Sequence, residues 1–228
     1  GPVVAGLCVA AAFLGFVFSI THTTVANTFF LLATQHLLTA MLAWLALGER
    51  PNRRTWFAMV LAVAGVATMV LDGIDRGEFF GNAMALVSAI GFAGLTVTLR
   101  ANRESDMRPG IAYGALFSTC IAGVALIVTS PPACTSQFVI SPRDLALCIA
   151  SGTVQVGAGM ALYTIGTRRV NASEASLFAL SEVMLAPVWV WWLLNEVPSR
   201  FTLIGGAMLL VAIAWRAWPS RRVPGPRC

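Results

Sequence analysis

The sequence contains no lysine, so all 15 of its basic residues are arginines, and only 11% of its 228 residues are charged. A soluble domain has about 25% charged residues, which argues against that class of protein. The five cysteines show no CxxC pair and no metal-ligand spacing. The chain also lacks a phosphate-binding glycine loop, an HExxH motif and a nucleophile elbow. We therefore expect no metal, no cofactor and no ATP-driven step.

The sequence is instead rich in apolar residues, which make up 57% of the chain and give a mean hydropathy of +0.78. They form eight continuous segments: 2–20, 24–47, 55–71, 80–99, 111–130, 144–167, 172–194 and 201–218. Each is close to the roughly 20 residues that span a bilayer core, and barrel strands would instead alternate over about ten residues. The sequence predicts an all-α polytopic membrane helix bundle of about eight transmembrane helices, with the lipid bilayer as a partner.

The arginines lie in the gaps between these segments and not along one stripe, so the net charge of +5 does not indicate nucleic acid. Twelve fall on one side of the predicted membrane: Arg50, Arg53, Arg54, Arg100, Arg103, Arg108, Arg168, Arg169, Arg216, Arg221, Arg222 and Arg227. Only Arg76, Arg143 and Arg200 fall on the other side. Because basic residues favour the cytoplasmic side, we expect a cell (inner) membrane protein with a cytoplasmic C-terminal tail, residues 219–228.

Part of the sequence occurs twice, since residues 24–67 align without a gap with residues 171–214 at an offset of 147. Identical residues cluster at one junction: Trp44 with Trp191, Leu47 with Leu194, Glu49 with Glu196, Pro51 with Pro198, Arg53 with Arg200 and Thr55 with Thr202. The copies lie five helices apart, so they should cross the membrane in opposite directions, as in inverted-repeat transporters. We expect an incomplete five-plus-five arrangement, with three helices of a first repeat in residues 1–72 and five of a second in residues 80–218.

The junctions also resemble those of a known family. The motifs that carry the resemblance are Thr24-Val25-Ala26-Asn27, Leu47-Gly48-Glu49-Arg50, Arg53-Arg54-Thr55-Trp56 and Ala64-Gly65-Val66, with Asn195-Glu196 at the second junction. Over nearly its whole length the chain resembles EamA-type transporters of the drug/metabolite transporter superfamily. The resemblance implies ten helices in two inverted five-helix repeats around a central cavity, and export of amino acids, other metabolites or drugs. Relative to that arrangement we expect the first two helices to be absent from this chain, and therefore a partner that supplies them, a homodimer, or an inactive truncated remnant.

The candidate substrate or proton site centres on Glu182, in the middle of segment 172–194. A carboxylate at mid-bilayer costs about 3 kcal/mol, so an ionisable residue there is a functional hypothesis by default. Its repeat mate is Gln35, in the middle of segment 24–47 and directly before His36. We expect Glu182 to bind a cationic or amino group of the substrate or a proton, or else to be a protonated acid bonded to a neighbouring helix. His36 is either a proton relay or a neutral side chain bonded between helices.

Other residues have two interpretations each. Gln155 and Tyr163 are predicted to line the cavity, and Trp189 is either an aromatic clamp near Glu182 or part of an interfacial belt. Asn27 and Glu174, which are repeat mates, are predicted helix-start or gate residues. The junction acids Glu49 and Glu196 each precede an arginine by four positions, which suits a tight turn with a local ion pair.

These features favour a secondary transporter of a small-molecule substrate, working as an exporter by alternating access between inverted repeats. Without an ATP motif, its energy would come from an ion gradient, from exchange or from the gradient of the substrate. The alternative is a polytopic intramembrane enzyme acting on lipid-linked substrates. Such an enzyme would need acids or histidines clustered at one interface, whereas here single polar residues lie at mid-depth in matching repeat positions. The sequence therefore predicts a protein that is not an enzyme.

Overall fold

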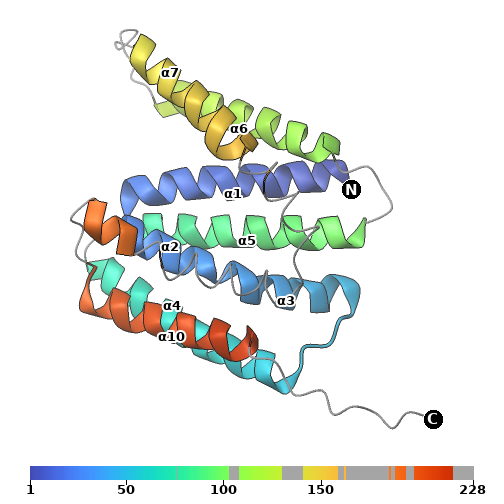
Figure 1. Cartoon of the computed structure of the whole chain (residues 1–228), viewed down its shortest axis with the longest axis vertical. Helices are drawn as coiled ribbons and strands as arrows, with labels where there is room; N and C mark the ends of the chain where they lie inside the picture. The colour runs from blue at the N-terminus through green and yellow to red at the C-terminus, as the bar shows by residue number, and fades with distance from the viewer. Residues whose placement is uncertain are drawn as a thin grey trace.

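A computed structural model describes residues 1–75, 77–102, 108–129, 141–158, 162, 185, 188–193 and 198–217, and no strand occurs among them (Figure 1). The elements are α1 (Pro2–His22), α2 (Val25–Ala33), α3 (Gln35–Leu47), α4 (Arg53–Asp75), α5 (Phe79–Ala101), α6 (Arg108–Thr129), α7 (Pro142–Ala150), the π-helix η2 (Ser151–Ala158) and α10 (Arg200–Ala217).

Four described stretches are long and apolar enough to cross a membrane: Pro2–His22, Val25–Leu47, Arg53–Ile74 and Phe79–Ala101. Shorter apolar helices cover Ala112–Ala125 and Arg200–Trp215. Large apolar side chains point outward along these helices, among them Val60 at 68% exposure and Val63 at 69%. An apolar surface of this extent suits lipid and not water. The predicted all-α polytopic membrane bundle is confirmed.

The predicted segment 24–47 forms one span, Val25–Leu47, in which the regular hydrogen-bond pattern is interrupted at Thr34, between α2 and α3; Thr34 itself keeps a helical backbone (φ −60°, ψ −19°). The Thr34 hydroxyl donates to the carbonyl of Leu31 at 2.6 Å, and the Thr34 N–H donates to the same carbonyl at 3.1 Å. A hydroxyl bonded to the backbone competes with the regular helical pattern, and a bond to the third residue back makes a tighter turn. The break therefore lies in the middle of the span, directly before Gln35.

The predicted segment 144–167 also departs from a regular helix. It begins at Pro142, because the Ser141 hydroxyl accepts the N–H of Asp144 at 3.2 Å and proline fits the first helical turn. After α7 the chain continues as the π-helix η2, which contains the backbone of Gln155. Short π-helical turns are rare and frequently lie at functional sites.

Helix α5 packs closely along α1, because small residues let the two backbones approach. A Cβ atom on Gly15 would lie 2.7 Å from the carbonyl oxygen of Met84, and one on Gly91 would lie 2.6 Å from the nitrogen of Ala12. Ser88 adds a hydrogen bond from its hydroxyl to the Ala12 carbonyl at 2.7 Å. Helix α6 packs against α1 as well, so α1 lies between α5 and α6 (Figure 1).

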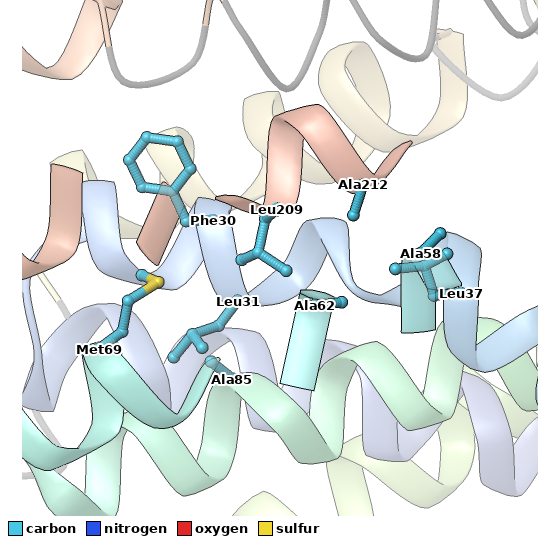
Figure 2. Close-up of a cluster of buried hydrophobic side chains, with 9 residues drawn as sticks. All are labelled: Phe30, Leu31, Leu37, Ala58, Ala62, Met69, Ala85, Leu209 and Ala212. Atoms are coloured by element: carbon cyan, nitrogen blue, oxygen red, sulfur yellow. The ribbon is translucent and has the colours of Figure 1, made fainter. Parts of the chain in front are cut away.

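Helices α4 and α10 form a second closely packed pair, and they run antiparallel (Figure 1). A Cβ atom on Gly65 would lie 2.7 Å from the carbonyl oxygen of Gly205, and one on Gly205 would lie 2.6 Å from that of Gly65. Figure 2 shows the buried apolar cluster that joins this pair to α2, α3 and α5: Phe30, Leu31, Leu37, Ala58, Ala62, Met69, Ala85, Leu209 and Ala212.

Candidate functional site

The two ends of the helix bundle differ in chemistry. One end, here called the polar end, holds one arginine, Arg200, and six uncharged or acidic side chains: Thr23, Asn27, Asp72, Glu78, Asn82 and Ser199. The opposite end, here called the arginine end, holds Arg50, Arg53, Arg54 and Arg100. The predicted site residues Gln35 and His36 lie between these ends, at the start of α3.

Hydrogen bonds join α1, α2 and α5 at the polar end. Thr23 Oγ1 donates to Glu78 Oε2 at 3.0 Å, and Asn27 Nδ2 donates to Thr23 Oγ1 at 3.2 Å and to Asn82 Oδ1. Asn27 and Asn82 are 1% and 0% exposed. Within the described part of the chain, Asn27 Oδ1 and Asn82 Nδ2 have no hydrogen-bond partner. The two amides therefore satisfy each other only in part.

Two further contacts tie the polar end together. The hydroxyls of Ser19 and Thr28 are 2.8 Å apart and fully buried between α1 and α2. Ser199 Oγ donates to Asp72 Oδ2 at 2.6 Å, which connects the start of α10 to the last turn of α4. The sequence predicts Asn27 as a helix-start or gate residue. Its N–H does lie in the first turn of α2, where the Thr24 hydroxyl caps it at 3.2 Å.

The arginine end is held by one described ion pair. Arg100 donates to both carboxylate oxygens of Glu49, at 3.0 and 3.1 Å, and the two side chains are 38% and 50% exposed. The prediction that Glu49 forms an ion pair within its own turn is therefore wrong. Its partner, Arg100, lies at the end of α5. Left-handed Gly48 (φ 71°) ends α3 and turns Glu49 back toward α5, which is why its partner lies far away in sequence.

Gln35 and His36 are both half-buried and follow the break at Thr34. Beside them lies a cavity of about 190 Å³ that is open to the outer surface of the bundle and lies between α3, α4 and α5, lined by Thr34, Leu37, Leu38, Met41, Met59, Ala62, Val63, Val66 and Leu86. The lining residues Thr34, Leu37, Leu38 and Met41 recur every three to four positions, so they share one face of α3. Gln35 and His36 lie on other faces of α3. The cavity is therefore apolar and distinct from the predicted polar site.

The other predicted site residues fall largely outside the described residues. Glu182 and Tyr163 are among these, and so is the side chain of Gln155. Trp189 is 50% exposed, with its ring centre 5.6 Å from that of Trp192. In the described part of the chain, no group of three or more His, Cys, Asp or Glu side chains is placed to hold a metal ion.

Asn82 is a residue that sequence reasoning misses. Its position near the start of the apolar segment 80–99 could have pointed to it, because a buried amide in lipid needs a hydrogen-bond partner on another helix.

The two repeat copies begin their last helices in the same way. In α4 the Asn52 side chain accepts the N–H of Thr55 at 2.8 Å, and in α10 the Ser199 side chain accepts the N–H of Thr202 at 3.0 Å. These pairs are related by the offset of 147, and both threonines are buried. Asn52 directly precedes α4 and Ser199 directly precedes α10, and these two helices begin at opposite ends of the bundle (Figure 1).

Residues 3–71 and 79–217 match the EamA-like transporter family. The chain belongs to this family. This confirms the family that the junction motifs indicated, and it identifies the chain as a multi-pass membrane transporter. It points away from the intramembrane-enzyme alternative.

Curated relatives of this EamA protein are transporters too. The chain is 25% identical to the uncharacterized transporter YwfM of Bacillus subtilis over 213 residues, which cover 92% of the chain and 70% of YwfM. It is 25% identical to the pseudopaline exporter CntI of Pseudomonas aeruginosa over 215 residues, which cover 92% of the chain and 72% of CntI. An uncharacterized transporter of Vibrio cholerae is 28% identical over 180 residues, which cover 77% of the chain and 56% of that protein. No solved structure matches the chain.

Proposed function

We propose that this EamA-family protein is a secondary transporter that exports a small metabolite, amino acid or drug by alternating access between two inverted repeats. The observation that carries the proposal is the pairing of α4 with α10. These helices are repeat mates, they run antiparallel, and their matching N-caps lie at opposite ends of the bundle. Inverted repeats of this kind are typical of transporters that alternate access around a fixed site. The similarity to an exporter, CntI, favours the direction of transport.

The contact between α4 and α10 has the symmetry that such repeats need. The offset of 147 relates Gly65 to Ala212 and Gly205 to Ala58. Gly65 and Gly205 make the close backbone approach, and Ala58 and Ala212 are both 0% exposed. Small residues thus occupy both symmetry-related positions. This supports a pseudo-two-fold axis that passes between the two helices.

Within this framework, we assign the substrate site to the mid-depth polar residues. The repeat relates Thr34-Gln35 to Ser181-Glu182, so a hydroxyl and then a polar side chain occur at the centre of both copies. Broken helices with polar groups at the break commonly form substrate sites in transporters. Glu182 would bind an amino group of the substrate or a proton, and Gln35 and His36 would bind its other polar groups.

Gln155, Tyr163 and Trp189 would line the same cavity. By the positive-inside rule, the arginine end and the C-terminus would face the cytoplasm.

The test is an export or resistance screen in cells that lack related transporters, followed by flux measurements on Glu182→Gln and Glu182→Ala. Flux should fall to the background of cells without the protein, because neither variant can pair with a cation or carry the proton. Asp144→Asn is the matched control, since Asp144 is an exposed carboxylate in the first turn of α7. Normal flux in both Glu182 variants across pH would exclude the assigned role of this residue.

A further inference from the structure

Helices α3 and α4 follow each other in the chain but leave a groove between them. Each packs mainly on another helix, α3 on α5 and α4 on α10, so the two touch each other little. The open cavity between α3, α4 and α5, here called the lateral groove, lies in this gap. Its α4 side is formed by Met59, Ala62, Val63 and Val66, which extend over about 10 Å of helix. The groove therefore has the length and the opening to receive a chain-like ligand from outside the bundle.

The chemistry of the lateral groove selects an apolar ligand. Its lining residues are apolar except for Thr34, and the Thr34 hydroxyl is already bonded to the carbonyl of Leu31 at 2.6 Å. Val63 is 69% exposed and Met41 is 37% exposed, so the groove opens on the outer surface of the bundle. At this depth a membrane protein meets hydrocarbon and not water. Lipid acyl chains are therefore the ligands that the groove meets.

Three arginines lie where the groove reaches the arginine end. Arg50 belongs to residues 48–52, which join α3 to α4, and Arg53 and Arg54 begin α4 (Figure 1). All three are exposed, and within the described part of the chain none of them forms an ion pair. The carboxylate of Glu49 is bound through both oxygens to Arg100 instead. The groove therefore ends at three positive charges that no described acid neutralises.

An aromatic pair separates the apolar groove from the arginines. Trp44 of α3 and Trp56 of α4 meet edge to face, with ring centres 5.4 Å apart. Each lies three positions from a lining residue, Met41 or Met59, on the side toward the arginine end. Tryptophan is enriched at the headgroup level of a membrane. The order of apolar groove, tryptophans and arginines thus matches the order of acyl chain, interface and phosphate in a phospholipid.

We propose that the lateral groove and the three arginines form a binding site for one anionic phospholipid. An acyl chain lies in the groove between α3 and α4, and Arg50, Arg53 and Arg54 bind the headgroup phosphate. Arginine suits this role because its N–H donors bind phosphate oxygens in pairs. Basic residues near the membrane surface also attract anionic lipids, and basic pockets between membrane helices bind their headgroups. The site goes beyond the proposed transport function, and its test needs no transport substrate.

The test measures lipid binding to the full chain by native mass spectrometry from a neutral detergent. Dioleoyl phosphatidylglycerol should bind as one molecule per chain and about tenfold more tightly than dioleoyl phosphatidylcholine, which has the same acyl chains but no net charge. Glycerol phosphate, which has the phosphate without an acyl chain, should not bind over the same concentration range. Phosphatidylglycerol with a photoreactive acyl chain should crosslink to residues 37–41 and 59–66.

Charge variants test the headgroup half of the site. Arg50→Gln, Arg53→Gln and Arg54→Gln should each weaken phosphatidylglycerol binding about fivefold, and the triple variant should weaken it on the order of a hundredfold. Arg143→Gln is the matched control and should bind normally, because Arg143 is an exposed arginine in the first turn of α7 and does not line the groove.

A pair of α4 variants tests the acyl-chain half. Val63→Trp places a large side chain in the mouth of the groove and should weaken binding and remove the crosslink. Val60→Trp is the matched control and should do neither, because Val60 is 68% exposed on α4 and does not line the groove. Both side chains are exposed, so neither variant should disturb the fold, and circular dichroism would verify this.

Four outcomes would overturn the proposal. They are equal affinity for the two lipids, equal effects of Arg143→Gln and of the other arginine variants, equal responses to Val60→Trp and Val63→Trp, or a stable dimer in which a second copy fills the groove and no lipid crosslinks there. Loss of transport in the Glu182 variants would leave each of these results unchanged, so the proposed function and the lipid site stand or fall separately.

Discussion

The polar end and the arginine end are built from the same helices but held by different forces. At the polar end, side chains from α1, α2 and α5 bond to one another while being buried, as with Asn27 and Asn82. At the arginine end, Glu49 and Arg100 meet in an exposed pair. A buried polar group cannot exchange its partner for water, whereas an exposed ion pair can. The comparison therefore implies one fixed end and one adjustable end.

The largest effect should come from a side chain added where the polar end has no room. A Cβ atom on Gly81 would lie 2.7 Å from the carbonyl carbon of His22 and from the nitrogen of Thr23, both backbone atoms. Gly81→Ala should lower the free energy of unfolding by up to about 3 kcal/mol, because the end of α1 must shift. Titration with denaturing detergent would measure this. Gly123→Ala, with nothing within 4 Å, is the control and should be neutral or slightly stabilising.

A double-mutant cycle would test whether the hydrogen bond between Asn27 and Asn82 stabilises the fold. Asn82→Leu should cost about 1–3 kcal/mol, because it leaves the buried Asn27 amide without its partner. Adding Asn27→Leu should recover most of that loss, since two apolar groups need no hydrogen bond. The same detergent titration gives all three values. If the double variant lost as much as both single variants together, the two residues would not be acting as a pair.

Backbone strain should affect both ends equally. Gly48 at the arginine end and Gly77 next to the polar end have φ values of 71° and 75°, and a Cβ atom added to either would meet nothing within 4 Å. Replacing either by alanine should cost about 1 kcal/mol, because only the left-handed backbone is penalised. Thermal or detergent unfolding of the two variants would measure both losses. Unequal losses would mean that one turn relaxes and the other does not.

The smallest effect should come from the ion pair at the arginine end. Arg100→Gln should change the free energy of unfolding by less than about 1 kcal/mol, since both partners are more than a third exposed. The change should disappear near 1 M salt, where the screening length is about 3 Å. A loss above that of Asn82→Leu, or one insensitive to salt, would contradict the division into a fixed and an adjustable end.

Sequence reasoning was sufficient for the helical membrane architecture and for the family. Continuous apolar runs force helices in lipid, and the Gly48–Glu49 junction carried the resemblance. It was not sufficient for the break at Thr34, because a single threonine is common in a membrane helix and its hydroxyl can bond several backbone atoms. The partner of Glu49 was likewise unpredictable from spacing. Arg53 is nearer in sequence, but the left-handed turn at Gly48 directs the carboxylate to Arg100.

The sequence by itself determined that the chain is a bundle of apolar membrane helices, and its repeat predicts which of them correspond to each other. Both follow from local composition and from the offset of 147. Only the tertiary structure decided that Asn27 meets Asn82 and that Glu49 pairs with Arg100. The reason is that residues more than 50 positions apart become neighbours through helix packing, which spacing along the chain does not reveal. The sequence already distinguishes the two ends by their arginines, and the packing of the helices decides which polar side chains meet at each end.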